Sequence, residues 1–209
     1  TCSVLLDGAV TSLSFSPDKV EVIAGTKKGF IYRLRTDGLY SLLVCENHSS
    51  PVVCVSFSPE TSDRFATASH DCTMRVWDAA DYSVLTTVAI RDAGKPTSLA
   101  YTLDFLISGW TDGKIRAHDS DAGQPLWLID NAHRGGVTAL LLSHNERYIM
   151  TGGMEGEVRI WEMRSRELVS HLKEHTSRVS SLALYDDDVH ALSCSRDRAF
   201  LCWDLAKEK

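Results

Sequence analysis

A ten-residue segment recurs five times along the chain, and this repeat restricts the fold more than any other sequence feature. The copies align without gaps at residues 25–34, 69–78, 110–119, 153–162 and 195–204. Their ninth residues follow one another at intervals of 44, 41, 43 and 42 positions; these residues are Arg33, Trp77, His118, Trp161 and Trp203. A fixed period of this length predicts an array of similar supersecondary units that pack on one another.

Each repeat also contains short apolar or alternating runs that are typical of β-strands. A first run begins at Val10, Val52, Pro96, Val137 or Val179. A second run precedes each turn, at residues 20–24, 64–68, 105–108, 148–151 and 189–193. The ten-residue segment supplies a third run, and a fourth follows it, for example at residues 83–89 and 168–172. The sequence therefore predicts an all-β chain with five repeats of four antiparallel strands.

Four short strands in every 40 to 45 residues, ending in Trp-Asp or a variant, resemble the blade of a WD-repeat β-propeller. The resemblance implies a single WD-repeat propeller region over residues 1–209. Its repeats are expected at residues 7–44, 49–88, 92–129, 134–172 and 176–209. Residues 1–6 are expected to form the outer strand of a preceding or closing blade.

The number of repeats is small for this family, because WD propellers usually close with about seven blades. The chain also opens with Thr1 and not with Met. We therefore expect an incomplete part of a larger propeller. Blades bury their apolar faces only against neighbouring blades, so two exposed terminal blades are expected to let the chain self-associate.

The WD resemblance implies a structural network of hydrogen bonds that locks the turn between two inner strands to the preceding loop. Such a buried polar chain fixes one geometry when every member has a partner. The residues expected in it are His48, Ser69, Asp71 and Trp77 in the second repeat, His133 and Trp161 in the fourth, and His175, Ser195, Asp197 and Trp203 in the fifth.

Several repeats depart from this pattern. The fourth has Gly153 and Glu155 at the Ser and Asp places. In the first repeat the alignment puts Lys27 at the Asp place and Leu6 at the His place, and the third repeat has His118 at the Trp place. We expect the first and third blades to be the less stable ones.

The same resemblance implies a partner-binding face formed by two sets of residues, which are otherwise ordinary solvated loop positions. The first set, just before the turn Asp, contains Thr26, His70, Thr111, Met154 and Arg196. The second set, at the opening of the first strand, contains Pro51, Gly136 and Arg178. Arg178 and Arg196 belong to one repeat and are expected to form a basic spot for a carboxylate-bearing partner.

Charge and composition argue against other function classes. The net charge of -6 opposes general nucleic-acid binding, which needs a basic face. The apolar runs are too short to span a bilayer, and no secretory signal opens the chain. Gly94-Lys95 lacks the upstream glycine of a phosphate loop, so no nucleotide or other cofactor is expected.

The sequence offers little that favours catalysis. Residues 171–175 spell H-x-x-E-H, a zinc-peptidase pattern that needs both histidines on one face of a helix. Here the segment leaves an outer strand, and His175 belongs to the structural network, so no metal site is expected. Sets such as Ser69, His48 and Asp71 lack an exposed nucleophile elbow and oxyanion donors. We therefore expect a chain that is not an enzyme.

A closer resemblance rests on residues 108–118, 129–140, 152–161 and 173–182. These stretches resemble the second propeller of the cilia- and flagella-associated protein 52 family, a WD-repeat family of motile cilia. The resemblance implies a cytoplasmic scaffold inside the axonemal doublet microtubule of cilia or flagella, with tubulin and other luminal proteins as partners. The alternative is a WD-repeat adaptor or peptide-binding module of another intracellular complex, such as a ubiquitin-ligase substrate receptor.

Overall fold

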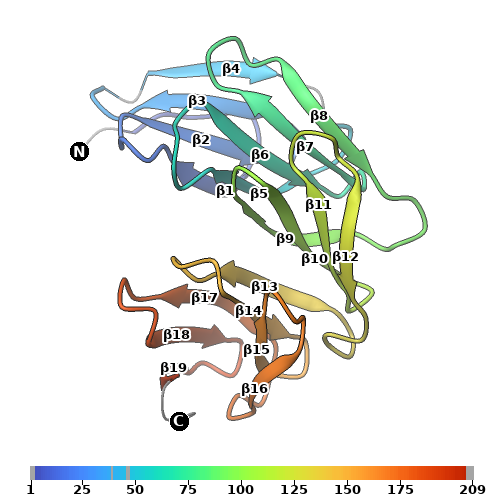
Figure 1. Cartoon of the computed structure of the whole chain (residues 1–209). Coiled ribbons are helices and arrows are strands. Elements are labelled where there is room, and N and C mark those ends of the chain that lie inside the picture. The colour runs from blue at the N-terminus through green and yellow to red at the C-terminus, as the bar shows by residue number, and fades with distance from the viewer. Residues whose placement is uncertain (1–2, 39, 46–47, 206–209) are drawn as a thin grey trace. The chain divides into compact units, whose positions relative to one another are not determined.

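The computed structural model describes residues 3–38, 40–45 and 48–205. This part of the chain is all-β, as predicted, and is built from successive antiparallel sheets, each of which is a propeller blade (Figure 1). Blade 1 contains β1 (Val10–Phe15), β2 (Glu21–Thr26), β3 (Ile31–Arg35) and β4 (Ser41–Cys45). Blade 2 contains β5 (Val52–Phe57), β6 (Arg64–Ser69), β7 (Thr73–Asp78) and β8 (Val84–Ala89).

The later blades follow the same plan. Blade 3 contains β9 (Pro96–Tyr101), β10 (Phe105–Trp110), β11 (Ile115–Asp119) and β12 (Pro125–Ile129). Blade 4 contains β13 (Val137–Leu142), β14 (Tyr148–Gly153), β15 (Val158–Glu162) and β16 (Leu168–Leu172). Blade 5 has three strands among the described residues, namely β17 (Val179–Leu184), β18 (His190–Ser195) and β19 (Phe200–Asp204).

Strands that are consecutive in the chain are neighbours in every sheet. Short turns therefore connect each strand to the next, which explains why the turn-and-strand pattern was readable from the sequence. Residues 3–6 lie outside the strands, since the first strand begins at Val10. Their place as the outer strand of a preceding or closing blade stays a prediction.

Contacts divide the chain into two compact units. Unit 1 comprises Thr1–Ile107 and Ala117–Trp127, and unit 2 comprises Ser108–Arg116 and Leu128–Lys209. In unit 1 the aromatic residues Phe57, Phe65 and Trp77 pack with Ile23 and Val52. In unit 2 Trp203 and Val179 of blade 5 pack with apolar residues of blade 4 such as Met150 and Ile160. No helix in the described part of the chain is long and apolar enough to cross a membrane.

In blades 1 and 4, a glycine at one register position lets the next blade pack closely. A Cβ atom at Gly25 would lie 2.5 Å from Cγ1 of Val52, and one at Gly152 would lie 2.6 Å from Cγ1 of Val179. Both glycines pair with the third residue of the first strand of their own blade, Ser12 or Ala139. The valine that opens the next blade thus packs directly on the glycine backbone.

Side-chain hydroxyl groups reinforce the same junctions. Thr11 Oγ1 donates to Gly25 O at 2.9 Å and lies 2.5 Å from Val52 O, while Thr138 Oγ1 lies 3.1 Å from Gly152 O and 2.6 Å from Val179 O. Each threonine thereby joins its own blade to the first strand of the following blade. The first strand carries a β-bulge at this threonine, and such a bulge re-aims a side chain.

Candidate functional site

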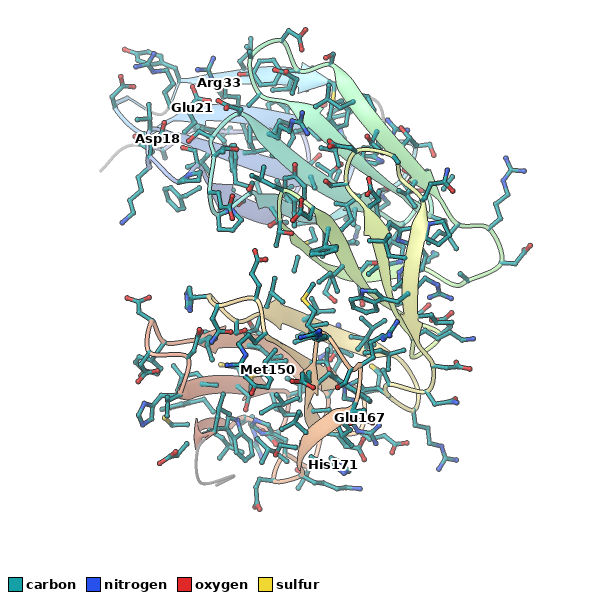
Figure 2. The ribbon with its side chains drawn as sticks, in the orientation of Figure 1. Asp18, Glu21, Arg33, Met150, Glu167 and His171 are labelled. Atoms are coloured by element: carbon teal, nitrogen blue, oxygen red, sulfur yellow. The ribbon has the colours of Figure 1, made fainter. Side chains whose placement is uncertain are left out.

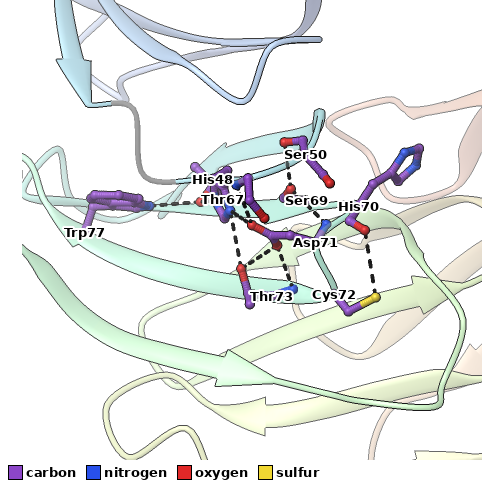
Figure 3. A network of polar contacts seen from close by, with 10 residues as sticks. His48, Ser50, Thr67, Ser69, His70, Asp71, Cys72, Thr73 and Trp77 are labelled. Carbon is purple, nitrogen blue, oxygen red and sulfur yellow. Dashed lines mark hydrogen bonds and ion pairs between the residues drawn. The ribbon is translucent and has the colours of Figure 1, made fainter.

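The turn between β6 and β7 is held by a continuous chain of side-chain hydrogen bonds (Figure 3). Nδ1 of His48 lies 2.9 Å from the Asp71 carboxylate, and Nε2 of His48 lies 2.8 Å from Oγ1 of Thr67. The indole Nε1 of Trp77 donates to the same Oγ1 at 2.9 Å. Three of the four residues expected in this network, His48, Asp71 and Trp77, are thus brought together.

The protonation states of His48 and Asp71 determine which group donates in each hydrogen bond of this network. Burial lowers the pKa of His48 and outweighs the opposing effect of Asp71, so the imidazole is neutral. Burial acts to raise the pKa of Asp71, but hydrogen bonds from Thr73 and His48 outweigh it and hold that pKa below its ordinary value. An ionised Asp71 only accepts, so the imidazole proton lies on Nδ1 and Nε2 accepts from the Thr67 hydroxyl.

Ser69 has a different role from the one expected. Its Oγ donates to Ser50 O at 3.0 Å and accepts from the backbone N–H of Asp71 at 3.2 Å. It therefore binds the turn to the preceding loop but does not connect His48 to Trp77. The connecting residue is Thr67, which sequence reasoning missed. A signal was present, because a hydroxyl residue stands ten positions before the tryptophan in blades 2, 4 and 5.

Blade 5 repeats this arrangement. Nδ1 of His175 lies 2.8 Å from Asp197, and Nε2 lies 2.8 Å from Oγ of Ser193, which also accepts from Nε1 of Trp203 at 2.8 Å. Burial raises the pKa of Asp197, but hydrogen bonds from Ala199, Thr176 and His175 outweigh it and lower the pKa to about 2. Ser195 takes the place of Ser69, since its Oγ donates to Ser177 O at 2.8 Å.

The H-x-x-E-H segment offers no zinc geometry. It lies on β16 and the loop that follows, and both ring nitrogens of His175 are already hydrogen-bonded. Nε2 of His171 lies 3.5 Å from the Glu157 carboxylate. Within the described residues, no group of three or more His, Cys, Asp and Glu side chains is arranged to hold a metal ion.

In blade 4 the buried acidic residue stands at a different position of the turn. His133 and Trp161 still share a hydroxyl, that of Thr151, at 2.8 and 3.0 Å. Glu155, at the Asp place, is exposed. The buried acid is Glu157, which sequence reasoning missed.

Glu157 is surrounded by basic groups. Its carboxylate lies 2.8 Å from Arg159, 3.5 Å from Lys173 and 4.0 Å from Nδ1 of His133. Burial, followed by the charge of Arg159, lowers the pKa of His133 to about 4. Gly153 leaves room for this histidine, because a Cβ atom there would lie 2.3 Å from Nδ1.

Blade 3 uses a tryptophan in place of the histidine. Nε1 of Trp110 donates to Oγ of Ser108 at 2.8 Å, so the indole binds the equivalent hydroxyl. The Arg116 guanidinium lies 5.0 Å from the centre of the Trp110 ring and pairs with Asp112 at 2.6 Å. Trp110 is fully buried and therefore packs in the core.

Among its described residues blade 1 lacks the network, and the structure shifts its alignment by one residue. The five turns contain the same backbone hydrogen bond, in which an N–H donates to the carbonyl of the residue three positions earlier. The pairs are Gly29 with Thr26, Cys72 with Ser69, Gly113 with Trp110, Gly156 with Gly153, and Arg198 with Ser195. Thr26 is therefore equivalent to Ser69, and Lys28, not Lys27, stands at the Asp place. Lys28 pairs with Asp7. Leu34 stands at the tryptophan place, and its neighbour Arg33 pairs with Glu21 (Figure 2).

The shift changes one member of the expected partner-binding face. Thr26 is fully buried, whereas Lys27 is exposed and takes the place that the alignment gave to Thr26. The backbone N–H groups of Lys27, His70, Met154 and Arg196 donate to the carbonyl groups of Ala9, Pro51, Gly136 and Arg178, respectively. We call these residues the tip pairs.

The tip pairs and Thr111, which was predicted to lie on the same face, differ in exposure. Thr111, Met154 and Arg196 are exposed, His70, Pro51 and Arg178 are half-buried, and Gly136 is buried. The His70 ring points away from the hydrogen-bonded network of blade 2 (Figure 3). Gly136 cannot carry a side chain to the surface, because a Cβ atom would lie 3.0 Å from Thr111 O. The exposed and half-buried members stay candidates for partner contact.

Comparison with known proteins gives two family-model matches. The model described as "WD domain, G-beta repeat" matches residues 39–78, and the model described as "Anaphase-promoting complex subunit 4 WD40 domain" matches residues 97–187. Together they cover parts of all five repeats.

Among curated proteins the chain is similar to "Cilia- and flagella-associated protein 52" from several organisms. The Sus scrofa protein is 32% identical over 98% of this chain, the Homo sapiens protein 30% over 98%, and the Chlamydomonas reinhardtii protein 30% over 96%. In each case the alignment covers 33% of the relative. The chain thus spans about a third of the length of the curated relatives it matches.

Proposed function

Because this chain is a WD-repeat β-propeller protein related to cilia- and flagella-associated protein 52, we propose that it is a non-catalytic protein-interaction scaffold of cilia or flagella. The observation that carries the proposal is the similarity over nearly the whole chain to relatives whose names place them in these organelles. Its place in the cell is accordingly the cytoplasm, within the axoneme.

The arrangement of the polar residues supports a scaffold. Histidine, acidic and hydroxyl side chains of the kinds that enzymes use hold turns in this chain, as in the His48–Thr67–Trp77 network. A buried network with all its members paired gives a rigid framework. Rigid frameworks that carry exposed loop residues are suited to presenting a binding surface. The tip pairs are the residues proposed for that surface.

The finer proposal is a doublet-microtubule inner protein that contacts tubulin and other luminal proteins and stabilises the doublet wall. The test is co-sedimentation of the purified chain with polymerised tubulin. Binding that Arg196→Glu weakens, and that Arg166→Glu on a different turn leaves unchanged, would support both the partner and the face. Absence of binding, together with absence from isolated axonemes of ciliated cells, would overturn the proposal.

A second candidate is an adaptor or peptide-binding module of another intracellular complex. The match of residues 97–187 to the WD40 domain of an anaphase-promoting complex subunit favours it. Affinity purification from ciliated cells distinguishes the two. Recovery of ubiquitin-ligase subunits without axonemal proteins would select the second candidate.

A further inference from the structure

Three arginines on blade 5 and the loop before it differ from most of the basic side chains near the turns. Arg178 and Arg196 form a tip pair, joined by a backbone hydrogen bond of 3.0 Å, and Arg198 follows two residues later. In blades 3 and 4 the arginines near the turns have carboxylate partners, such as Asp112 for Arg116 and Glu157 for Arg159. Within the described residues, none of the three blade-5 arginines makes an ion pair.

The one acid between these arginines is not free to neutralise them. Asp197 accepts from Nδ1 of His175, from the backbone N–H of Thr176 at 3.0 Å and from that of Ala199 at 2.9 Å. Its carboxylate is thus committed to holding the turn. The Nε of Arg178 is buried and has no hydrogen-bond partner in the described structure. A buried donor of this kind is costly until an acceptor reaches it.

Arg198 occupies a strained backbone position. Its φ is 71°, in the left-handed region, where the equivalent turns of blades 1, 3 and 4 carry Gly29, Gly113 and Gly156. An arginine there costs stability relative to glycine.

We propose that Arg178, Arg196 and Arg198 form a binding site for the carboxylate groups of an extended acidic peptide segment. The inference rests on the proposed scaffold function and names the chemistry of its partner. Arginine presents a planar fork of N–H donors that matches a carboxylate. The exposed Met154 lies at the equivalent tip of blade 4, and an apolar side chain there suits a peptide partner. The net charge of -6 disfavours a nucleic-acid chain at the same place.

The experiment measures fluorescence anisotropy of a labelled peptide of alternating glycine and glutamate, titrated with the purified full chain at low salt. The wild-type chain should bind it, and should not bind the same peptide with glutamine in place of glutamate. Arg196→Glu should weaken binding about tenfold, since the reversed charge both removes an attraction and adds a repulsion.

Arg198→Gly gives the sharper test, with Arg166→Gly as its matched control. Arg166 is also an exposed arginine in the left-handed region, with a φ of 63°, but it lies in the β15–β16 turn. Both substitutions remove one positive charge and relieve strain, so neither should lower the urea midpoint of unfolding. Only Arg198→Gly should weaken peptide binding, about threefold or more.

Three results would overturn the inference. They are absence of binding to the glutamate peptide, equal weakening by both glycine variants, or tighter binding of a deoxythymidine oligomer than of the peptide. Equal weakening by both glycine variants would indicate nonspecific electrostatic attraction, and tighter binding of the oligomer would indicate a site for polyanions. Binding to polymerised tubulin without binding to the peptide would remove this inference alone and leave the proposed function standing.

Discussion

A single hydroxyl group lies at the centre of each complete turn network. In blade 2 the Thr67 hydroxyl accepts a hydrogen bond from Trp77 and donates one to His48. In blades 4 and 5, Thr151 and Ser193 likewise bind the histidine and the tryptophan of their own networks. Threonine and serine are thus interchangeable here, because the chemistry needs only one proton and one accepting oxygen.

We predict that Thr67→Val destabilises the chain by about 3 kcal/mol, because it leaves the Trp77 indole N–H and the His48 Nε2 buried without a partner. Valine keeps the shape of threonine, so the loss measures the hydroxyl. Urea unfolding monitored by tryptophan fluorescence gives the value. The control is Ser69→Ala, which removes only the link to Ser50 and should cost about 1 kcal/mol. A larger loss for Ser69→Ala than for Thr67→Val would contradict this ranking.

A pH effect is expected from His133. Its folded pKa is lowered to about 4 by burial and by Arg159, from an ordinary value of 6.5. Between these two values the unfolded chain binds a proton that the folded chain does not, so stability is present above pH 6.5 and falls toward pH 4. Because the group is buried, the change of its pKa from 6.5 to about 4 corresponds to about 3 kcal/mol in the free energy of unfolding.

The corresponding measurement is the free energy of unfolding of wild type and His133→Gln at a series of pH values. The variant should lose part of the slope between pH 6.5 and 4, while the lowered pKa of His48 keeps the remainder in the same direction. Identical slopes for the two proteins would show that His133 does not carry this effect.

At the scale of strands and turns, the sequence predicted the existence and order of the strands well. Alternating apolar runs and turn residues mark each strand, and all of the predicted first, second and third runs became strands. Predicting the alignment was harder in blade 1. That blade has no His, Asp or Trp at the network places, so no anchor distinguished Arg33 from Leu34 as the equivalent of Trp77.

The hydroxyl and buried-acid positions escaped prediction for a different reason. Thr67 and Ser193 lie inside apolar strands, where a hydroxyl residue is compatible with simple packing. Glu157 was overlooked because Glu155 occupies the usual place of the acid. Only the folded strands show which carboxylate is buried beside Arg159. The contacts of such residues depend on the neighbouring strand and not on their own sequence spacing.

The glycine at the blade junction leads to a prediction about packing. Gly152→Ala should destabilise the chain by about 2 kcal/mol, because the added Cβ collides with Val179 and the junction must open. Thermal or urea unfolding measures the change. The control is Cys194→Ser, which alters the same register position in blade 5, where the side chain is exposed. An equal loss at both positions would argue against the junction as the cause.

At the scale of the molecule, both terminal blades expose apolar side chains. In blade 1 the exposed fractions are 58% for Leu13 and 60% for Phe15, although Val4 and Leu6 cover a neighbouring cluster of that blade. In blade 5 Phe200 is 72% exposed. Apolar surface of this kind favours association between proteins.

We therefore predict that the purified chain self-associates, and that Phe15→Glu or Phe200→Glu shifts it toward the monomer. Sedimentation velocity over a wide range of protein concentration measures the effect. A matched substitution at Tyr40, an exposed aromatic residue immediately before β4, should leave the association unchanged. Strictly monomeric behaviour of the wild type at every concentration would disprove the prediction.

The hydrogen bonds that threonine side chains make between blades also affect how the chain folds during its synthesis. Thr11 reaches Val52, and Thr138 reaches Val179, each across 41 positions. These long-range bonds span a single repeat. During synthesis, a blade can therefore dock its neighbour as soon as one further repeat has left the ribosome, long before the chain is finished. These blades are suited to stepwise assembly in the order of their synthesis, because few strand edges stay unpaired until a distant partner is made.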